Sequence, residues 1–576
     1  MKFPFSGILM FFITSVIAFG QVLNIKTGAA LVNKGNLILK CDWINDGTFA
    51  DTSATVIFSG TAQNIGGTVV SAFNNLTVST GSTATVTSAG QTLERILLCN
   101  GTLNGGGFLT LKSTAKRTAL IDGSGTGQVL GNIIMQRYLL SGFGYKYVSS
   151  PFQTSTVNEF GDDLNLADSW PTFYRYDESR TSSGWVSYVT PSNLLNPMAG
   201  YAANFGSSGS AITVDITGVV NNGTLSTTLY NHNNTYTQGF NLVGNPYPSP
   251  INWDAPSGWT KTNIDDALYY FKASTTDEYD GTYSTYINGI SSDGLATAII
   301  PSMQGFFVHV SDGSYPVTGA LGLDNSVRIT DLTHSFMKSD EESSVPLLRL
   351  GAAFEDDTTS TDPMVVYFDQ KAETGFDSGL DALKLMNTDY YVPNLFSVST
   401  DGKKLSINAL PEFSDTLCTI PLGLKINIDG NIVFRMIDVA EELSGKKIFM
   451  SDKVSGTEHD LLNDQKYKVF LKSGEYMDRF FLNLRSVATE IPGITSDNDL
   501  FSVYSSNGVI KAYIKTDRTG AGNLSISNLT GQTLFIKRIY DAGYNEFNPV
   551  VKDGIYIVNF VSENYRGSKK IFIGNQ

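Results

Sequence analysis

Short runs of alternating apolar residues, separated by Gly, Asn and Asp, recur along this chain of 576 residues and constrain its fold most strongly. Ala54–Phe58, Met364–Phe368 and Gly554–Phe560 are typical: each is brief and rich in β-branched or aromatic residues. Alternation with a period of two is the pattern of half-buried strands. Within residues 345–485 the alternation lapses at 379–386 and 438–443, and short helices are expected there. The sequence therefore predicts a nearly all-β protein of several domains.

Residues 21–138 are rich in Gly, Ser, Thr and Asn, and their strand-like runs are separated by Gly- and Asn-containing corners. This texture favours a β-solenoid, in which each coil buries its apolar face on the next. The period is loose, so a plain β-sandwich remains the alternative. The composition is similar to that of the N-terminal regions of bacterial surface adhesins.

Residues 139–327 are richer in aromatic side chains, and two of their blocks resemble each other. Tyr145–Phe152 is followed by Asn196–Phe205, and Phe240–Tyr247 is followed by Pro301–Val310. In each block an aromatic strand ends at a small residue and a Pro, and its partner begins at Met-x-Gly. Pro and Gly mark strand ends. We interpret this as internal duplication of a β-rich unit with a period of about 100 residues.

The remaining runs predict a β-sandwich domain over residues 345–485, a linker over 486–498 and a terminal sandwich of about seven strands over 499–576. A second polar stretch, residues 330–344, is expected to join the aromatic region to the first of these sandwiches.

Four motifs in the terminal domain carry a family resemblance. They are Leu524–Leu534, Gly543–Phe547, Lys552–Val558 and Ser568–Ile573. In this order and spacing they resemble the immunoglobulin-like C-terminal sorting domain (type A) of proteins exported by the type IX secretion system of Gram-negative bacteria. The resemblance implies that the domain addresses the chain to that apparatus and is removed by cleavage in the preceding linker. One departure is Tyr504–Asn507, where the family usually has a Tyr-Pro-Asn-Pro-like turn.

Residues 1–20 have the features of a secretory signal peptide. Lys2 precedes an apolar run over 8–19, and the small residues Ala18 and Gly20 stand before an expected cleavage site at Gln21. No other run approaches the roughly 20 apolar residues of a transmembrane helix. We therefore expect a mature protein without a transmembrane segment, secreted or held at the cell surface after passage through the periplasm.

Charge and cysteine content exclude some functions. The net charge of −15 has the wrong sign for a nucleic-acid or anionic-membrane binder. The three cysteines, Cys41, Cys99 and Cys418, cannot form a closed disulfide framework. Pairing of Cys41 with Cys99 and burial of both as free thiols are both compatible with the sequence.

Motifs for catalysis are missing from the sequence: there is no Gly-x-Ser-x-Gly, no phosphate loop, no His-Glu-x-x-His and no Cys-x-x-Cys. The four histidines stand alone in their segments, and we expect His309 to be satisfied within the fold. Four clusters of acidic residues could bind Ca²⁺ through their carboxylate oxygens, with solvated loop carboxylates as the alternative. They are Asp162–Asp163, Asp177–Glu178, Asp277–Asp280 and Glu355–Asp357. Several amphipathic aromatic residues are candidates for ligand contact, with packing of the β cores as the alternative: Trp170, Trp185, Trp253, Trp259, Tyr174, Tyr176 and Tyr188.

These observations assign no catalytic, cofactor-binding or metal-binding residue, and no cofactor is expected. The predicted function is non-enzymatic, adhesin-like binding of glycans or extracellular matrix, with the type IX apparatus as a further partner. The main alternative is a secreted polysaccharide-degrading enzyme, which needs two carboxylates about 5–10 Å apart in one cleft. A structural component of a surface filament, with long exposed sheet edges, is a third possibility.

Overall fold

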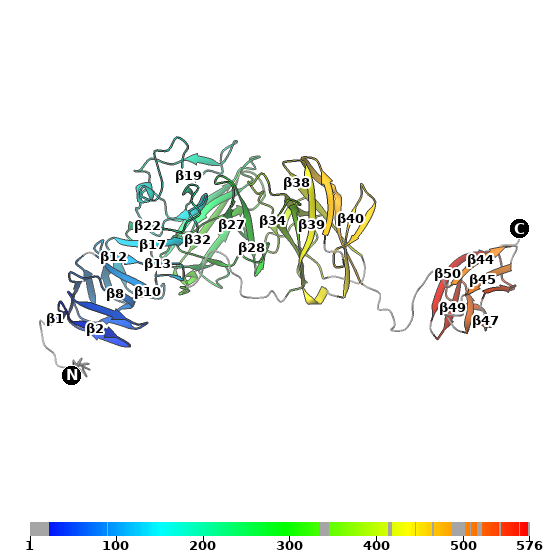
Figure 1. The fold of residues 1–576 in the computed structure, drawn as a ribbon, viewed down its shortest axis with the longest axis horizontal. Helices are drawn as coiled ribbons and strands as arrows, with labels where there is room; N and C mark the ends of the chain where they lie inside the picture. The colour runs from blue at the N-terminus through cyan, green and yellow to red at the C-terminus, as the bar shows by residue number, and fades with distance from the viewer. Residues whose placement is uncertain are drawn as a thin grey trace, which may run out of the picture. The chain divides into compact units, whose positions relative to one another are not determined.

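The computed structural model describes residues 22–88, 90–332, 345–412, 417–443, 445–463, 466–486, 501–506, 509–514, 521–540, 543–563 and 565–573. They are all-β, with no α-helix and only short 3₁₀ helices, and the chain divides into two compact units, residues 1–485 and 486–576 (Figure 1). The predicted signal peptide, most of the predicted linker 486–498 and His334 lie outside the described residues.

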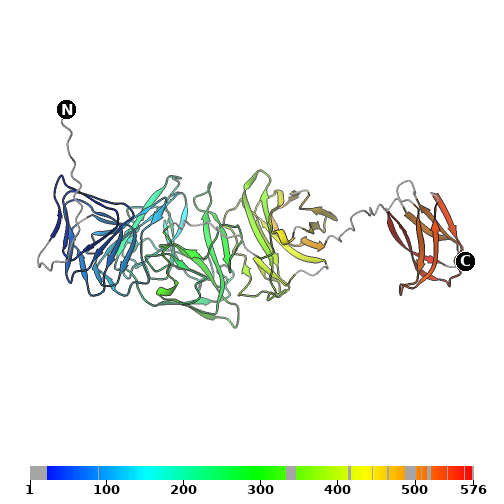
Figure 2. The same ribbon diagram turned by 90° about the horizontal axis from the view of Figure 1, so that it is seen from below.

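A parallel β-solenoid forms the N-terminal part of the first unit, and its stacked strands are the blue ones in Figures 1 and 2. One sheet holds β1 (Val22–Ile25), β4 (Asp42–Asn45), β7 (Gln63–Gly66), β9 (Thr83–Val86), β11 (Thr102–Asn104) and β16 (Gln128–Leu130). A second holds β3 (Asn36–Leu39), β6 (Thr55–Phe58), β8 (Ala72–Val78), β10 (Gln91–Cys99), β12 (Leu109–Leu111) and β17 (Ile133–Leu139). Smaller pairs are β2 (Ala30–Asn33) with β5 (Thr48–Asp51), and β13 (Ser113–Thr114) with β14 (Arg117–Thr118); β15 (Leu120–Ile121) joins β10. The solenoid prediction is confirmed over the sandwich alternative.

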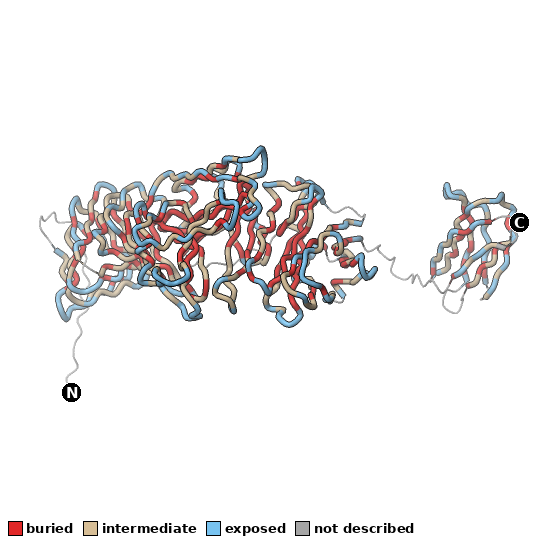
Figure 3. Tube along the Cα trace, turned by 90° about the horizontal axis from the view of Figure 1, so that it is seen from above, coloured by how far each residue is buried: buried red, intermediate tan, exposed pale blue. Residues whose placement is uncertain are grey.

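The solenoid core consists of columns of buried side chains at matching places of successive coils. Leu39 pairs with Phe58, Phe58 with Val78 and Val78 with Cys99, at spacings of 19, 20 and 21 residues. All four are buried, and Figure 3 shows buried segments in red throughout the described strands. Such burial is worth about 1.5–3 kcal/mol for a large apolar side chain. Cys99 belongs to this core and Cys41 does not pair with it, since all three cysteines are free thiols.

The last solenoid strand is covered by a strand from the next region. β22 (Ile212–Gly218) pairs antiparallel with β17 along its whole length, from Ile133 with Gly218 to Leu139 with Ile212. The solenoid sheet thus continues past the predicted boundary at residue 138 and ends in a strand of opposite direction.

The aromatic region contains four further sheets. They are β18 (Tyr145–Ser149), β21 (Gly200–Asn204), β19 (Phe173–Tyr176) and β20 (Trp185–Ser187); β24 (Phe240–Gly244), β31 (Gly305–Val310), β27 (Ile264–Ala273), β28 (Gly281–Ile287) and β29 (Ile290–Ser291); β23 (Leu225–Asn231), β32 (Val317–Leu323) and β26 (Trp259–Thr262); and β25 (Ile251–Asn252) with β30 (Ile299–Ile300). The short helices η1 (Val157–Phe160) and η2 (Asn325–Val327) lie in the connections.

The two sequence blocks that resemble each other take equivalent positions. In one, β18 pairs with β21 and Ser149 lies opposite Gly200; in the other, β24 pairs with β31 and Gly244 lies opposite Gly305. The methionines before these partner strands, Met198 and Met303, both have a positive φ, 65° and 60°. Equivalent motifs therefore form equivalent strand pairs.

Residues 345–485 form one continuous curled sheet. Its strands are β41 (Thr457–Asp460), β40 (Lys446–Asp452), β43 (Gly474–Ser486), β38 (Cys418–Ile426), β36 (Asn394–Val398), β37 (Lys404–Leu410), β34 (Asp357–Phe368), β33 (Leu347–Phe354), β39 (Gly430–Val439) and β42 (Lys466–Leu471), with β35 (Ala382–Leu383) on β37. One face encloses a core that includes Leu350 and Phe434. On the other face Val365 and Ile407 share a core with Tyr269 and Phe307 of the aromatic region.

The two helices expected in this region are not formed as expected. At residues 379–386 the chain makes a turn and then the strand β35, because Asp381 accepts hydrogen bonds from the backbone N–H groups of Asp377 and Ala409. Around residues 438–443, β39 continues to Val439 and only a 3₁₀ turn follows, η3 (Glu441–Leu443).

The second unit is a small sandwich of seven strands within its described residues. One sheet holds β44 (Phe501–Ser506), β45 (Val509–Ile514) and β48 (Gly543–Phe547); the other holds β47 (Thr533–Ile539), β46 (Gly522–Ser527), β49 (Gly554–Ser562) and β50 (Arg566–Ile573). Ile510 and Ala512 from one sheet pack with Leu524 and Val558 from the other in one buried core.

Candidate functional site

Five aromatic rings form a continuous series on the aromatic region, which we call the aromatic row. Tyr279 lies 6.5 Å from Tyr145, Tyr145 6.1 Å from Tyr174, Tyr174 6.5 Å from Trp185, and Trp185 5.0 Å from Tyr176, between ring centroids. They come from β18, β19, β20 and the loop between β27 and β28. Tyr279 is 54% exposed and the other four are partly exposed.

The aromatic row rests on a layer of buried aromatic side chains. Trp185 contacts Tyr147 and Phe307, with centroids 5.5 and 6.1 Å away. Tyr147 stacks on Phe271, and its hydroxyl lies 2.9 Å from that of Tyr283. This packing restricts the motion of the Trp185 ring, and a ring that is already held loses less entropy when it forms a further contact.

The rim of the aromatic row is acidic. A hydrogen bond with Glu278 and the charge of that carboxylate raise the pKa of Tyr279, and the negative charge of Asp168 adds to this. Burial raises the pKa of Tyr145, and the neighbouring Tyr174 contributes. The phenols therefore stay protonated at neutral pH, as hydrogen-bonding groups beside carboxylates.

The other aromatic candidates have different environments. Trp253 is buried and donates its indole N–H to the carbonyl of Asp266, and Trp259 packs on it at 4.8 Å. Tyr188 stacks on Tyr201. Trp170 is 73% exposed and is not part of the row. Core packing thus accounts for Trp253 and Trp259, whereas Trp185, Tyr174 and Tyr176 are partly exposed members of the aromatic row.

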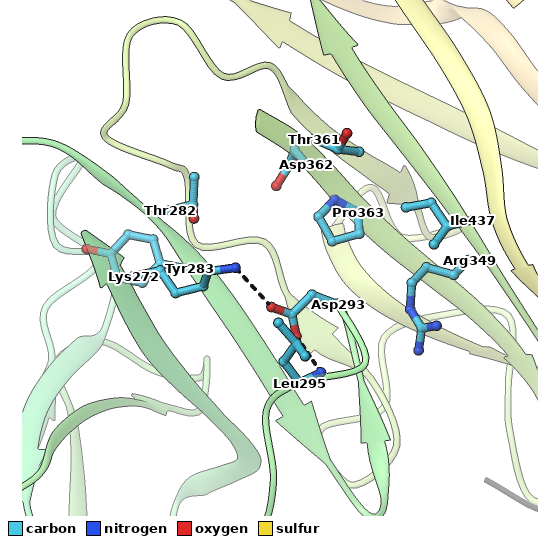
Figure 4. Close-up of a pocket in the computed structure, with 10 residues that line it drawn as sticks. All are labelled: Lys272, Thr282, Tyr283, Asp293, Leu295, Arg349, Thr361, Asp362, Pro363 and Ile437. Atoms are coloured by element: carbon cyan, nitrogen blue, oxygen red, sulfur yellow. Dashed lines mark hydrogen bonds and ion pairs between the residues drawn. The ribbon is translucent and has the colours of Figure 1, made fainter. Parts of the chain in front are cut away.

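A polar pocket of about 180 Å³ lies between β27, β28 and the curled sheet (Figure 4). It is lined by Lys272, Thr282, Tyr283, Asp293, Leu295, Arg349, Thr361, Asp362, Pro363 and Ile437. Asp293 accepts from the hydroxyls of Ser284 and Ser291 at 2.6 and 3.0 Å, and from the backbone N–H of Leu295. Arg349 donates to the carbonyls of Ser291 and Ser292 and to Asp438.

The two pocket carboxylates are held by structural contacts. Asp293 accepts the bonds just described, and Asp362 is paired with Lys384. An acid and a base for glycoside hydrolysis need freedom to exchange protons with a substrate. Both carboxylates instead have their hydrogen-bond partners within the protein.

The described histidines are satisfied separately. His309 is buried, with Nδ1 2.6 Å from Asp265 Oδ2, as expected of a residue satisfied within the fold. His232 makes a similar contact with the buried Glu178. His459 packs against Tyr467. Asp265 also accepts a hydrogen bond from the hydroxyl of Ser311, so its carboxylate lies between Ser311 and His309. In a nucleophilic triad the imidazole lies between the hydroxyl and the carboxylate, so these three residues do not form one.

The acidic clusters serve local structure in two cases. Asp357 accepts from Thr359 and Ser360 in a turn, and Asp177 accepts from Ser179. Within the described ranges no group of three or more His, Cys, Asp or Glu side chains is placed to hold a metal ion. No helix in the same ranges is long and apolar enough to cross a membrane.

Two members of the row, Tyr145 and Tyr279, were not among the sequence candidates. Tyr145 was visible at the start of the first repeated block, and Tyr279 stands inside the acidic cluster 277–280. They lie 134 residues apart in sequence, and only the fold brings their rings together.

Comparison with known proteins places the chain in a family. No curated protein matches it. One solved structure, titled "Biofilm associated protein - BSP domain", is 10% identical, with 77% of this chain and 92% of that chain covered and a TM-score of 0.11. A family model described as "Domain of unknown function (DUF8693)" matches residues 39–484, which include the solenoid from the end of β3 onward, the aromatic region and nearly all of the curled sheet. The chain belongs to the DUF8693 family.

Proposed function

We propose that this protein is an adhesin-like binding protein of the cell surface or the medium, which contacts a glycan or matrix ligand through the aromatic row. The observation that carries the proposal is the row itself: five adjacent rings, partly exposed and backed by a rigid layer. Aromatic faces stack on the apolar faces of sugar rings, while phenol and carboxylate groups at the rim bind hydroxyls.

A binding experiment with matched tyrosine variants tests this proposal. Tyr174→Ala and Tyr279→Ala each remove one ring, and Tyr236→Ala removes a tyrosine that is 69% exposed outside the row. A stacking ring contributes about 0.5–1.5 kcal/mol, so each row variant is expected to weaken binding on a glycan or matrix-protein array about 2- to 12-fold. The Tyr236 variant should bind like the wild type. Equal binding by all three variants would remove the row from the proposal.

The export route is a second part of the proposal. We assign the second unit as the type IX sorting domain, and the placement of its motifs supports this. Leu524–Leu534 spans the hairpin between β46 and β47, where Gly531 takes the positive φ of 82° that the turn requires. Gly543–Phe547 is β48, and Ser568–Ile573 lies in β50.

Mass spectrometry of the protein from cells and medium, with and without a working type IX apparatus, tests the route. The expected result is an extracellular form that ends near residue 495 and appears only when the apparatus works. A full-length chain that stays in the periplasm in both strains would contradict the assignment.

A further inference from the structure

A buried lysine and a buried aspartate meet inside the curled sheet. Lys384 Nζ lies 2.7 and 2.6 Å from the two carboxylate oxygens of Asp362, and the side chains are 3% and 1% exposed. Asp362 is on β34, and Lys384 follows β35. By contrast, the ion pair of Lys468 with Glu355 is exposed to solvent, with side chains that are 51% and 40% exposed.

The carboxylate oxygens of Asp362 also receive N–H groups from fixed positions. Asn387 Nδ2 donates to Oδ1 at 2.8 Å, and the backbone N–H of Leu395 donates to Oδ2 at 2.6 Å. The amide of Asn387 cannot turn freely, because its Oδ1 accepts from the backbone N–H of Tyr283 at 3.0 Å. N–H groups preset around a carbonyl carbon stabilise the negative charge that grows on oxygen when a nucleophile attacks.

We propose that Lys384 and Asp362 react to form an intramolecular amide (isopeptide) bond. A proton moves from the Nζ ammonium to Oδ1, which gives a neutral amine beside a neutral acid. The amine attacks Cγ, and the Leu395 N–H stabilises the oxyanion on Oδ2. A second proton passes from Nζ to Oδ1, the Cγ–Oδ1 bond breaks, and one water molecule leaves as the Cγ–Nζ amide forms.

The surroundings favour this reaction in two ways. Burying charged groups is costly, so replacing the buried ion pair by a neutral amide removes that cost. The contacts at 2.6–2.7 Å place Nζ at the oxygen edge of the carboxylate, so the flexible lysine chain has only a short distance to move before Nζ lies over the face of Cγ. Holding both groups in one site raises their effective concentration by many orders of magnitude. Asp362 borders the 180 Å³ pocket of Figure 4, which provides a place for the released water.

The bond would close a covalent loop of the chain between residues 362 and 384. A cross-link reduces the freedom of the unfolded chain, as a disulfide does. All three cysteines here are free, so no disulfide does this for the protein.

Proteolysis after complete denaturation tests the proposal on the wild-type full-length chain. An amide at Lys384 removes its charge and blocks trypsin there, so residues 350–371 and 372–403 should appear as one linked species whose mass is one water below the sum. Lys468 is the internal control. Its ion pair with Glu355 is exposed to water, so no amide is expected there and trypsin should cleave after Lys468 normally. A peptide that ends at Lys384, or unlinked peptides of full mass, would overturn the proposal.

Two variants identify the partners. Lys384→Arg keeps a cation and restores the trypsin site, and Asp362→Ala removes the acyl group; both should restore the full mass of all peptides, which can be measured whether or not the variants fold well. A linked species of the same type in the Asp362 variant would show another partner and overturn the assignment.

Discussion

The backbone N–H of Gly244 donates to the carbonyl oxygen of Met198 at 2.9 Å, and this bond ties the end of β24 to the approach of β21. The equivalent bond, from Ser149 to Met303, runs in the other direction at 3.2 Å. Each repeated block therefore fastens the other, and the centre of the aromatic region depends on close backbone contact between them.

A methyl group at Gly200 should break this contact. A Cβ there would lie 2.5 Å from the carbonyl oxygen of Val243, so Gly200→Ala should lower the free energy of unfolding by about 1–3 kcal/mol. Gly209 has nothing within 4 Å of its Cβ position, and Gly209→Ala is the control, with an expected change within about 0.5 kcal/mol. Urea unfolding measures both. If the two variants are equally stable, the contact is not tight.

Removal of a solenoid core ring should cost much more than removal of a surface side chain. Phe58 is fully buried in its column, so Phe58→Ala should destabilise the protein by about 3–5 kcal/mol through lost burial and the cavity left behind. Ile38, on the neighbouring strand β3, is 59% exposed, and Ile38→Ala should change the unfolding free energy by less than about 0.5 kcal/mol. Similar losses in calorimetry would argue against the inward orientation of the column.

The pH dependence of stability should respond to Asp163. Burial and the negative charges of Asp162 and Asp215 raise the pKa of this carboxyl to about 6 in the folded protein, against about 3.9 in the unfolded chain. The folded state thus holds this proton more tightly, and the group's contribution to stability is lost as the pH rises from about 4 to 6. Relative to the wild type, Asp163→Asn should gain stability across this window.

The midpoints of urea unfolding of the wild type and of Asp163→Asn, measured between pH 4 and 7, give the difference in stability between the two proteins. Groups that titrate alike in both proteins cancel in this difference. Asp162→Asn is the control: it removes only a neighbouring charge and should give a smaller change of the same sign. A wild-type–variant difference that is constant with pH would contradict the assignment to Asp163.

Arg328 joins the solenoid to the aromatic region, and its removal should weaken both. Its guanidinium donates to Ser249 Oγ at 2.7 Å and to the carbonyl of Ile121, and it lies 5.0 Å from the ring of Tyr247. Arg328→Met leaves these buried acceptors without their donor, at a cost of about 1–3 kcal/mol. Arg180→Met, in an exposed loop, should cost little. Equal unfolding midpoints for the two variants would show that the link contributes no stability.

The all-β class was predictable because strand alternation is local. Ala54–Phe58 alternates in sequence and its side chains alternate in burial as β6. The direction of neighbouring strands is not local, which is why the pattern left solenoid and sandwich open; the parallel pairing of β3, β6 and β8 decided between them. At residues 379–386 the loss of alternation predicts a helix, but the chain forms a turn and the strand β35. The hydrogen bond from the backbone N–H of Ala409 to Asp381 helps to hold this conformation, and a contact between residues so far apart leaves no local pattern in the sequence.

The candidate site was predictable only in part, for the same reason. Trp185, Tyr174 and Trp253 have the same amphipathic chemistry, yet Trp253 is fully inside a core and the other two are only partly buried at the edge of another. The pairing of Lys384 with Asp362 gave no sequence signal at all. Residue type indicates what a side chain can do, whereas its neighbours depend on which strands pair.

The pairing of β22 with β17 closes the end of the solenoid that adjoins the aromatic region. Coils added or lost at intervals of one repeat leave the join to the aromatic region unchanged, because β17 keeps its partner. Each coil changes the length of the solenoid by one strand spacing, about 4.8 Å. The distance between the first coil, at β1, and the aromatic region is therefore set by the number of coils, in whole steps of one strand spacing.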